Sequence, residues 1–389
     1  MKTTFLSISV FVLTSFTSSI AEAADTVRLC TYNVLKYSVA NEDGRVPHFQ
    51  RILNTIRPNV IVCQEVDAGD IGPRWITDVL TYGSFASSPF IDGEDTDNML
   101  FYDQLLFDLV DQRRFGTDLR DIAEFRLATK RTDGTDQDTI VIYSVHLKAS
   151  DGGENAAQRG AEMLTLLQNV RSHPYAVIAG DWNIYGTSEP AYRHATASDT
   201  LRRFIDPLGS SWRRNIASDA RFYTQSTRNA LAGCGGGVGG GLDDRFDLIV
   251  VSEQLFQRTI VSTYTHFGND GIPRLNNELD DPENTVVDAD MVAALKCASD
   301  HLPVYVDVIL GDVQASVSDP SSGSWLRPNG TSWLVQSSVP HSPWSITDVR
   351  GITVASGHTT TEWTPIDMES IPHGVYGVTV GSQRAVVVR

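Results

Sequence analysis

Short apolar runs rich in Val, Ile and Leu recur from Thr26 to about Leu310 and alternate with stretches of helical periodicity. Several runs are apolar on successive residues, which is typical of strands buried on both faces. The runs predict β-strands at Val27–Val34, Val60–Glu65, Thr139–His146, Ala176–Asp181, Phe246–Val251 and Leu302–Ile309.

The segments between these runs include two clear helices. The longer is predicted over Ala156–Arg171, where Ala161, Leu164 and Leu167 follow helical spacing. The other covers His48–Ile56 and is ended by Pro58. Strands that alternate with helices predict an α/β fold whose sheets are covered by helices.

The composition changes at Gly311, where the α/β pattern ends. A Ser/Asp/Pro/Gly-rich stretch over 313–324 is expected to be a linker, and residues 325–389 are rich in Trp, Val, Thr and Gly. Short alternating runs such as Trp333–Gln336 and Trp344–Asp348 predict a small all-β module there. The main domain is then expected to cover 24–312.

The first 23 residues have the pattern of an export signal. Lys2 precedes the apolar stretch Phe5–Phe16, and Ala21-Glu22-Ala23 is a typical cleavage site. The apolar stretch is too short for a good membrane span, and no later segment approaches that length. We therefore expect a secreted or cell-surface protein without a transmembrane segment.

The chain is acidic, with 48 Asp and Glu against 31 Lys and Arg and a net charge of −17. Such a surface repels polyanions at long range, so tight non-specific binding to duplex DNA requires a local basic patch. Solubility explains most of this charge, and bound cations would also suit it. The acidic loops Asp92–Asn98 and Glu278–Asp290 lack EF-hand spacing, and structural Ca²⁺ there is the minority interpretation.

The four cysteines fall into two pairs. Cys30 and Cys63 lie in strand-like runs and are expected to be buried thiols. Cys234 and Cys297 lie in loops, and we predict a disulfide between them, which an oxidising compartment allows. Ala232–Gly241 is glycine-rich but lacks the Lys-Ser/Thr of a phosphate-binding P-loop, so a surface loop is expected.

Chemistry-bearing residues stand at the ends of the predicted strands. At the carboxyl ends these are Asn33, Glu65, His146 and Asp181, and at the amino ends Asp247, Asp300 and His301. If the last strands run antiparallel to the earlier ones, all of these groups converge on one edge of the sheets. A shared cation site at that edge would accommodate carboxylates that a core could not bury unpaired.

The residue types suggest a division of roles. Glu65 and Asp300 are hard oxygen ligands suited to Mg²⁺ or Mn²⁺, and Asn33 can add a neutral oxygen. Asp181 and Asn183, two residues apart, face the same way in an extended chain and could position water and phosphate.

Proton transfer is expected from the histidines. His301 could carry a proton while Asp247 orients its ring, and His146 would assist. This set serves in-line attack of water on a phosphodiester. Lys148, Arg159 and Arg245 are the cations best placed to meet a substrate phosphate, although Arg159 is equally well explained as a surface charge.

These motifs resemble those of the endonuclease/exonuclease/phosphatase superfamily. The resemblance runs from about Arg28 to Ile309, through TYNVL at 31–35, VCQEVD at 62–67, SVHLKAS at 144–150, AGDWNIY at 179–185, RFDLIVVS at 245–252 and SDHLPV at 299–304. It implies a four-layer α/β/β/α sandwich with two mixed central sheets. It also implies metal binding by Glu65 with Asn33 and Asp300.

Departures from the family pattern bear on the substrate. Leu35 stands where abasic-site enzymes carry Asp, and Lys148 replaces the aromatic residue of deadenylase-like members. The end of the chain, with GVYGV at 374–378 and VVVR at 386–389, resembles the C-terminal sorting domains of the type IX secretion system. That resemblance implies contact with the secretion machinery, and the alternative is a carbohydrate- or surface-binding β-domain.

The sequence thus predicts an exported, divalent-metal-dependent phosphodiesterase, with an extracellular nuclease as the leading interpretation. A lipid-headgroup or sugar-phosphate phosphoesterase is the chemical alternative, which the acidic charge favours mildly. An inactive surface-binding protein is the alternative of another class, against which the retention of every catalytic position argues.

Overall fold

The computed structural model describes residues 25–130, 138–197, 203–229, 236–310, 326–329, 332–337, 341–348, 352–360, 363–367, 371, 375–380 and 383–388. The predicted signal peptide, the linker and Cys234 lie outside these residues. No helix in the described part of the chain is long and apolar enough to cross a membrane.

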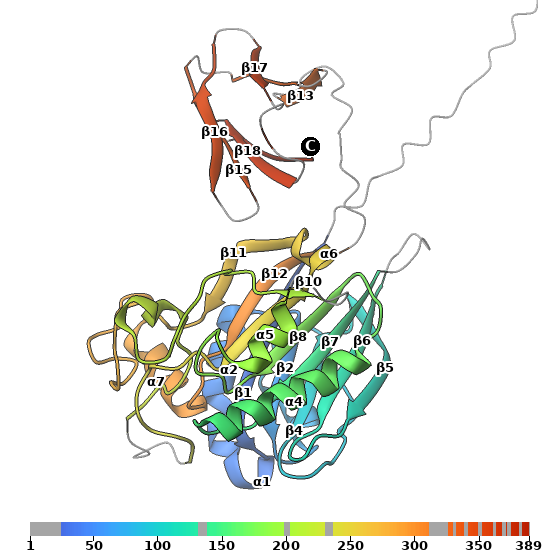
Figure 1. Ribbon diagram of the computed structural model, residues 1–389, viewed down its shortest axis with the longest axis vertical. Coiled ribbons are helices and arrows are strands. Elements are labelled where there is room, and N and C mark those ends of the chain that lie inside the picture. The colour runs from blue at the N-terminus through green and yellow to red at the C-terminus, as the bar shows by residue number, and fades with distance from the viewer. Residues whose placement is uncertain are drawn as a thin grey trace, which may run out of the picture.

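Two six-stranded sheets form the centre of the molecule (Figure 1). The first has the order β11-β12-β1-β2-β4-β3, with β11 Thr259–His266, β12 Val304–Leu310, β1 Asp25–Tyr37, β2 Val60–Val66, β4 Asp97–Asp103 and β3 Phe85–Ser87. The second has the order β5-β6-β7-β8-β10-β9, with β5 Phe107–Phe115, β6 Ile122–Thr129, β7 Thr139–His146, β8 Ala176–Asp181, β10 Asp247–Ser252 and β9 Phe204–Ile205.

Both sheets are mixed, and the directions of their strands matter for the site. In the first sheet β1 runs parallel to β2 and antiparallel to β12. In the second, β8 runs parallel to β7 and antiparallel to β10. Strands β10 and β12 therefore begin at the edge where β1, β2, β7 and β8 end. This is the arrangement in which the polar residues at the strand ends can converge.

Alternation along the strands explains the layers. Val60 and Val62 of β2 pack into the core between the two sheets, whereas Ile61 and Cys63 pack outward beneath helices. Both faces of the strand are buried, which is why its sequence is apolar on successive residues.

Helices cover the outer face of each sheet (Figure 1). The first is packed by α2 Val46–Ile56, α3 Ile71–Asp78 and α7 Ala289–Ala298, and the second by α4 Gly153–Asn169 and α5 Pro190–Thr196. Short helices occur at α1 Val39–Glu42 and α6 Glu253–Phe256, with 3-10 turns at Asp43–Arg45 and Ala217–Phe222. The predicted α/β class and four-layer arrangement are confirmed.

A polar chain ties the two sheets together beneath the site. Thr31 Oγ1 on β1 donates to Gln64 Oε1 at 3.1 Å, and Gln64 Nε2 on β2 donates to Ser144 Oγ on β7 at 3.0 Å. The Ser144 hydroxyl donates in turn to Asn98 Oδ1 on β4 at 2.7 Å. Because each of these buried groups is satisfied by a neighbour, the network holds the two sheets in one relative position.

The end of the chain forms two small antiparallel sheets with their own apolar core. One has the order β13-β14-β17, with β13 Leu326–Asn329, β14 Ser332–Val335 and β17 Thr364–Asp367. The other has the order β16-β15-β18-β19, with β16 Thr353–His358, β15 Pro343–Asp348, β18 Val375–Val380 and β19 Gln383–Val388. An all-β module is thus present where the sequence predicted one.

The described cysteines agree with the predicted division. Cys30 and Cys63 are free and buried in the core under α2 and α3. Burial raises the pKa of both thiols well above the usual range. Cys297 is disulfide-bonded.

Candidate active site

The register of the strands in the second sheet brings its three site residues together. His146 at the end of β7 is paired in register with Asp181 at the end of β8. Asp181 is paired in turn with Asp247 at the start of β10. These three side chains therefore stand in one row across the sheet edge, with Asp181 in the middle.

The first sheet contributes Asn33 from β1, Glu65 from β2, and Asp300 and His301 from the turn before β12. Asn33 joins the two sheets, because its Nδ2 donates to Glu65 Oε1 at 3.1 Å and to Asp181 Oδ2 at 3.0 Å. The predicted convergence of the strand-end groups is therefore observed.

Local backbone geometry explains how the motifs present their side chains. Gly180 has φ +143, and Asn183 and Glu65 lie in the left-handed region at φ +51 and +57. Asn183 turns back so that its backbone N–H donates to Asp181 Oδ1 at 3.0 Å. Its side-chain amide donates to the Leu147 carbonyl at 3.2 Å, which fixes its carboxamide beside the site.

Three groups at the junction of the sheets could hold a cation. The ligand atoms of Glu65, His146 and Asp181 all lie within 4.8 Å of one another, and His146 Nε2 is 3.4 Å from Asp181 Oδ2 and 3.8 Å from Glu65 Oε1. Ligands bound octahedrally at about 2.1 Å are about 3 Å apart when adjacent and about 4 Å apart when opposite. The donor set therefore fits a divalent cation.

This set differs from the metal ligands predicted from sequence, which were Asn33, Glu65 and Asp300. Only Glu65 belongs to both sets. Asn33 turns its amide nitrogen, a donor, toward Glu65, while its Oδ1 accepts from the Leu35 backbone N–H at 2.9 Å. The amide oxygen is thus engaged locally, because Leu35 and Lys36 within β1 lie in the left-handed region and bend the strand there.

Asp300 is held by a loop and a side-chain amide. Its Oδ2 accepts from the Val238 N–H at 2.7 Å and from Gln225 Nε2 at 3.3 Å, while its buried Oδ1 has no hydrogen bond. A Cβ added to Gly237 would lie 2.9 Å from the Asp300 carboxyl carbon. Part of the glycine-rich stretch therefore packs directly on the site, and glycine is what permits this close approach.

His301 and Asp247 form a buried pair. His301 Nδ1 lies 2.8 Å from Asp247 Oδ2, and its Nε2 lies 3.7 Å from Asp181 Oδ2. Burial by itself would lower the pKa of His301, but the Asp247 and Asp181 carboxylates outweigh it and raise that pKa well above its ordinary value. A protonated His301 beside Asp181 is suited to donating a hydrogen bond or a proton to a group bound at the site.

The pKa values of Asp181 and His146 are shifted in opposite directions. Burial, reinforced by Asp247 and Glu65, raises the pKa of Asp181 to about 7. Burial and the Arg120 guanidinium lower the pKa of His146 well below its ordinary value. His146 is therefore neutral near pH 7 and can offer a lone pair, which the residue needs to bind a cation.

The predicted substrate cations lie elsewhere. Arg245 is fully buried in an ion pair with Asp206, with its Nη1 2.7 Å from Asp206 Oδ2. Arg159 is also fully buried, and its guanidinium holds Glu189 at 2.8 Å and the Ser150 carbonyl at 2.9 Å. Both arginines stabilise the fold, and neither lines the cavity at the site.

Lys148 does not line the cavity either, and its Nζ donates to the Ala149 carbonyl at 2.9 Å. The cations that do line the cavity are Lys36, Arg120 and Arg214. None of these three was predicted from the sequence, and Arg120 and Arg214 follow no strand motif. Position immediately after TYNVL was the one signal that could have indicated Lys36.

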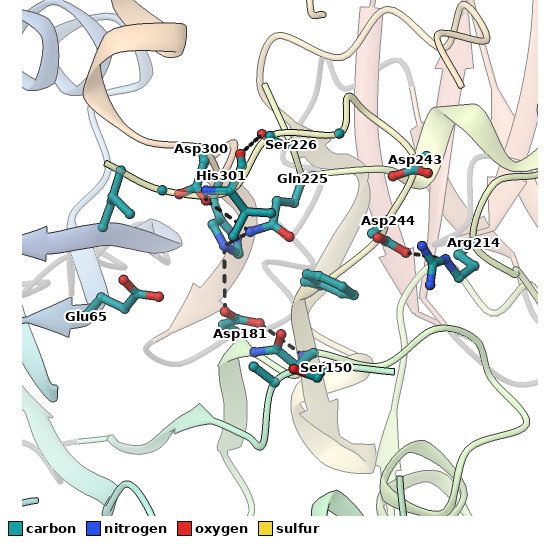
Figure 2. Close-up of a pocket in the computed structure, with 18 of the residues that line it drawn as sticks. Glu65, Ser150, Asp181, Arg214, Gln225, Ser226, Asp243, Asp244, Asp300 and His301 are labelled. Atoms are coloured by element: carbon teal, nitrogen blue, oxygen red, sulfur yellow. Dashed lines mark hydrogen bonds and ion pairs between the residues drawn. The ribbon is translucent and has the colours of Figure 1, made fainter. Parts of the chain in front are cut away.

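The site opens into a cavity of about 620 Å³. Figure 2 shows Asp181, Asp300 and His301 near its centre, with Glu65 at one side and Asp243, Asp244 and Arg214 at the other. Gln225, also missed from the sequence, lines the same cavity with its amide 2.7 Å from His301 Nε2. The cavity therefore connects the proton-carrying groups, the cation set and basic side chains.

Comparisons with known proteins found likeness among solved structures. The sequence matches no established family profile and no curated protein. The chain is similar to truncated Caenorhabditis elegans TDP2, with 15% identity, a TM-score of 0.46 and coverage of 73% of this chain and 98% of that one.

Two further structures are similar to the chain at comparable levels. The human Nocturnin catalytic domain with bound sulfate shares 18% identity, with a TM-score of 0.45 and coverage of 74% and 95%. An endonuclease/exonuclease/phosphatase family protein from Bacteroides thetaiotaomicron shares 13% identity, with a TM-score of 0.44 and coverage of 75% and 100%.

Three features of the chain bear on its resemblance to the superfamily. The motifs occur in the expected order, two mixed sheets pack face to face, and the motif residues meet at one edge of both sheets. These features agree with the resemblance to the endonuclease/exonuclease/phosphatase superfamily that the sequence motifs carry.

Proposed function

We propose that the chain is a divalent-metal-dependent phosphodiesterase that hydrolyses its substrate by in-line attack of water. One observation carries this proposal: the buried His301–Asp247 pair is directed at Asp181, whose carboxylate also belongs to the cation-binding set with Glu65 and His146. Proton transfer and charge neutralisation would thus act at the same carboxylate.

Each group has a distinct task in this proposal. His301, kept protonated by Asp247, hydrogen-bonds a phosphoryl oxygen or protonates the leaving group, and Asp181 orients the attacking water. Asn183, fixed by its bond to Leu147, positions the phosphate. A cation bound at Glu65, His146 and Asp181 would supply neutralisation of the phosphoryl charge.

For the substrate we propose a phosphodiester, with nucleic acid as the leading class. We also propose that the signal peptide exports the enzyme and that it meets this substrate outside the cytoplasm. Lys36 and Arg120 support this substrate, because they give the cavity local positive charge in a chain whose overall charge is −17. Contact of the C-terminal module with the type IX secretion machinery belongs to the same proposal and rests on sequence resemblance.

The test is hydrolysis of bis(p-nitrophenyl) phosphate, DNA, RNA and sphingomyelin in the presence of Mg²⁺ or Mn²⁺. We expect turnover of a phosphodiester that EDTA abolishes and that Asp181→Ala reduces by at least about 10³-fold. Asp290→Ala is the matched control, because it removes an exposed carboxylate of α7 outside the cavity.

Two results would change the proposal. Turnover that is equal in Asp181→Ala and Asp290→Ala would show that the activity does not come from this site. Cleavage of sphingomyelin without cleavage of nucleic acid would replace the nuclease by a lipid-headgroup phosphodiesterase.

A further inference from the structure

One wall of the site cavity carries two adjacent carboxylates that the proposed reaction does not use. Asp243 and Asp244 line the cavity together with Arg214. Figure 2 shows these three side chains grouped on the side away from Glu65, with His301 between. A substrate whose phosphate lies near His301 would therefore extend its attached group toward this wall.

The backbone of the wall is firmly placed. The N–H groups of Asp243 and Asp244 both donate to the Gln225 carbonyl at 3.0 Å, and the Gln225 N–H donates to the Asp244 carbonyl at 3.0 Å. The Asn215 N–H donates to the Asp243 carbonyl at 2.9 Å. Since the Gln225 side chain also contacts His301, the wall and the catalytic histidine share one scaffold.

The two carboxylates lack hydrogen-bond donors. Asp243 is 7% exposed and Asp244 is 8% exposed, and within the described residues no hydrogen bond reaches the Asp243 carboxylate. Asp244 Oδ1 is buried without a hydrogen bond, and its nearest cation is Arg214 Nε at 3.5 Å. Because buried polar groups are normally hydrogen-bonded, this wall is suited to a ligand that brings donors.

The charges around the wall bear on which ligand groups it can bind. Asp243 and Asp244 are two adjacent carboxylates in the cavity lining, and their negative charge disfavours a second phosphate beside them. An ammonium group would meet Arg214, which already lies 4.5 Å from the centre of the Tyr185 ring. Hydroxyl groups meet neither obstacle, because they donate to the carboxylates and accept from the guanidinium.

We propose that Asp243, Asp244 and Arg214 form a subsite for vicinal hydroxyl groups on a sugar or polyol attached to the scissile phosphate. The subsite rests on the proposed function for its role in turnover. It selects an uncharged, hydroxylated neighbour over a further phosphate. Two sources carry this chemistry: the ribose of a ribonucleotide, and a glycerol-like headgroup.

Matched p-nitrophenyl phosphodiesters test the subsite in turnover. One pair is built on uridine and 2′,3′-dideoxyuridine at the 5′ position, and the other on glycerol and propanol. We expect a KM roughly tenfold lower for the hydroxylated member of at least one pair, which equals about 1.4 kcal/mol. In the double variant D243N/D244N that KM ratio should fall to about two or less.

A binding measurement gives a readout independent of turnover. Calorimetry with Mn²⁺-loaded protein compares uridine 5′-monophosphate with its 2′,3′-dideoxy analogue, and glycerol 3-phosphate with propyl phosphate. We expect the diol to bind about tenfold more tightly in the wild type and about equally in D243N/D244N. Asp290→Asn, an exposed matched control on α7, should keep the wild-type preference.

The outcomes separate the subsite from the proposed function. A preference in the uridine pair assigns a ribose, and one in the glycerol pair assigns a headgroup. If the wild type shows no preference for the diol, the proposed subsite is wrong. It is also wrong if D243N/D244N keeps the full wild-type preference. If that double variant does not fold, Arg214→Gln must reduce the same preference. Failure to hydrolyse any phosphodiester would overturn the proposed function, while calorimetry would still decide the subsite.

Discussion

At the scale of single residues, the site depends on where each proton is held. His301 and Asp181 have pKa values raised for different reasons: His301 by the flanking carboxylates in spite of its burial, and Asp181 by burial and its neighbouring negative charges. The result is a protonated imidazole 3.7 Å from a carboxylate that titrates near neutrality. His301 can therefore act as the acid and Asp181 as the base, side by side in the same site.

Substitution of Asp247 tests how far the protonation and orientation of His301 depend on the Asp247 carboxylate. We expect Asp247→Asn to lower kcat by at least about 10³-fold and His301→Ala by a similar factor, because both remove the held proton. Circular dichroism and thermal unfolding should remain close to wild type for His301→Ala. Loss of the folded state in that variant would show instead that His301 is structural.

The cation set makes a second prediction at this scale. An imidazole among the ligands shifts preference away from Mg²⁺ and toward Mn²⁺, because nitrogen is a softer donor than oxygen. We expect Mn²⁺ to raise the melting temperature more than Mg²⁺ at equal concentration, and Glu65→Gln to abolish most of that rise. Equal stabilisation of Glu65→Gln and wild type by Mn²⁺ would place the cation elsewhere.

At the scale of elements, the site depends on two strands that pair without side-chain obstruction. Gly180 precedes Asp181 on β8, and a Cβ added there would lie 2.0 Å from the Val145 carbonyl oxygen on β7. The glycine in the GDWN motif is therefore required by parallel pairing of β7 and β8, which is the pairing that aligns His146 with Asp181.

Gly180→Ala should consequently separate these strands. We expect a loss of at least about 4 kcal/mol in the free energy of unfolding, or failure to fold, since backbone would have to move on both strands. Gly44→Ala is the matched control, because an added Cβ there meets nothing within 4 Å. Equal stability of the two variants in urea unfolding would contradict the pairing constraint.

At the scale of the whole molecule, raised pKa values make the cation-free fold sensitive to pH. Asp181 and Asp244 both titrate at about 7 when folded but near 4 when unfolded, so the folded state binds more protons between these values. His301, also raised, contributes in the same direction. Stability from these groups is complete at low pH and is lost as pH rises through about 7.

We therefore expect the melting temperature in EDTA to fall between pH 6.5 and pH 8, a range above the ordinary pKa of His146 and His266, whose pKa values burial lowers. Saturating Mn²⁺ should flatten this dependence, because a bound cation replaces the proton on Asp181. Asp181→Asn should show a smaller fall than wild type in EDTA. A melting temperature that is constant or rising across this range in wild type would mean that these carboxylates are not buried as described.

Much of the architecture follows from local pattern. The predicted strands at Thr139–His146 and Ala176–Asp181 have the same bounds as β7 and β8, because burial on both faces makes the apolar runs continuous. By contrast, β5 and β6 were not predicted. Arg113 of β5 pairs with Glu124 of β6, and such charged residues within strands obscure the apolar pattern.

The sequence by itself determined the family motifs, the α/β class, and which residue types stand at strand ends, since these depend on order along the chain. Only the tertiary structure decided which of those groups touch. It placed His146 and the amide of Asn33 beside Glu65 and Asp181, held Asp300 against Gln225 and Val238, and buried Arg245 in the core. The physical reason is that ligand geometry and charge pairing depend on distances of a few ångströms between strands, which strand register and turns set.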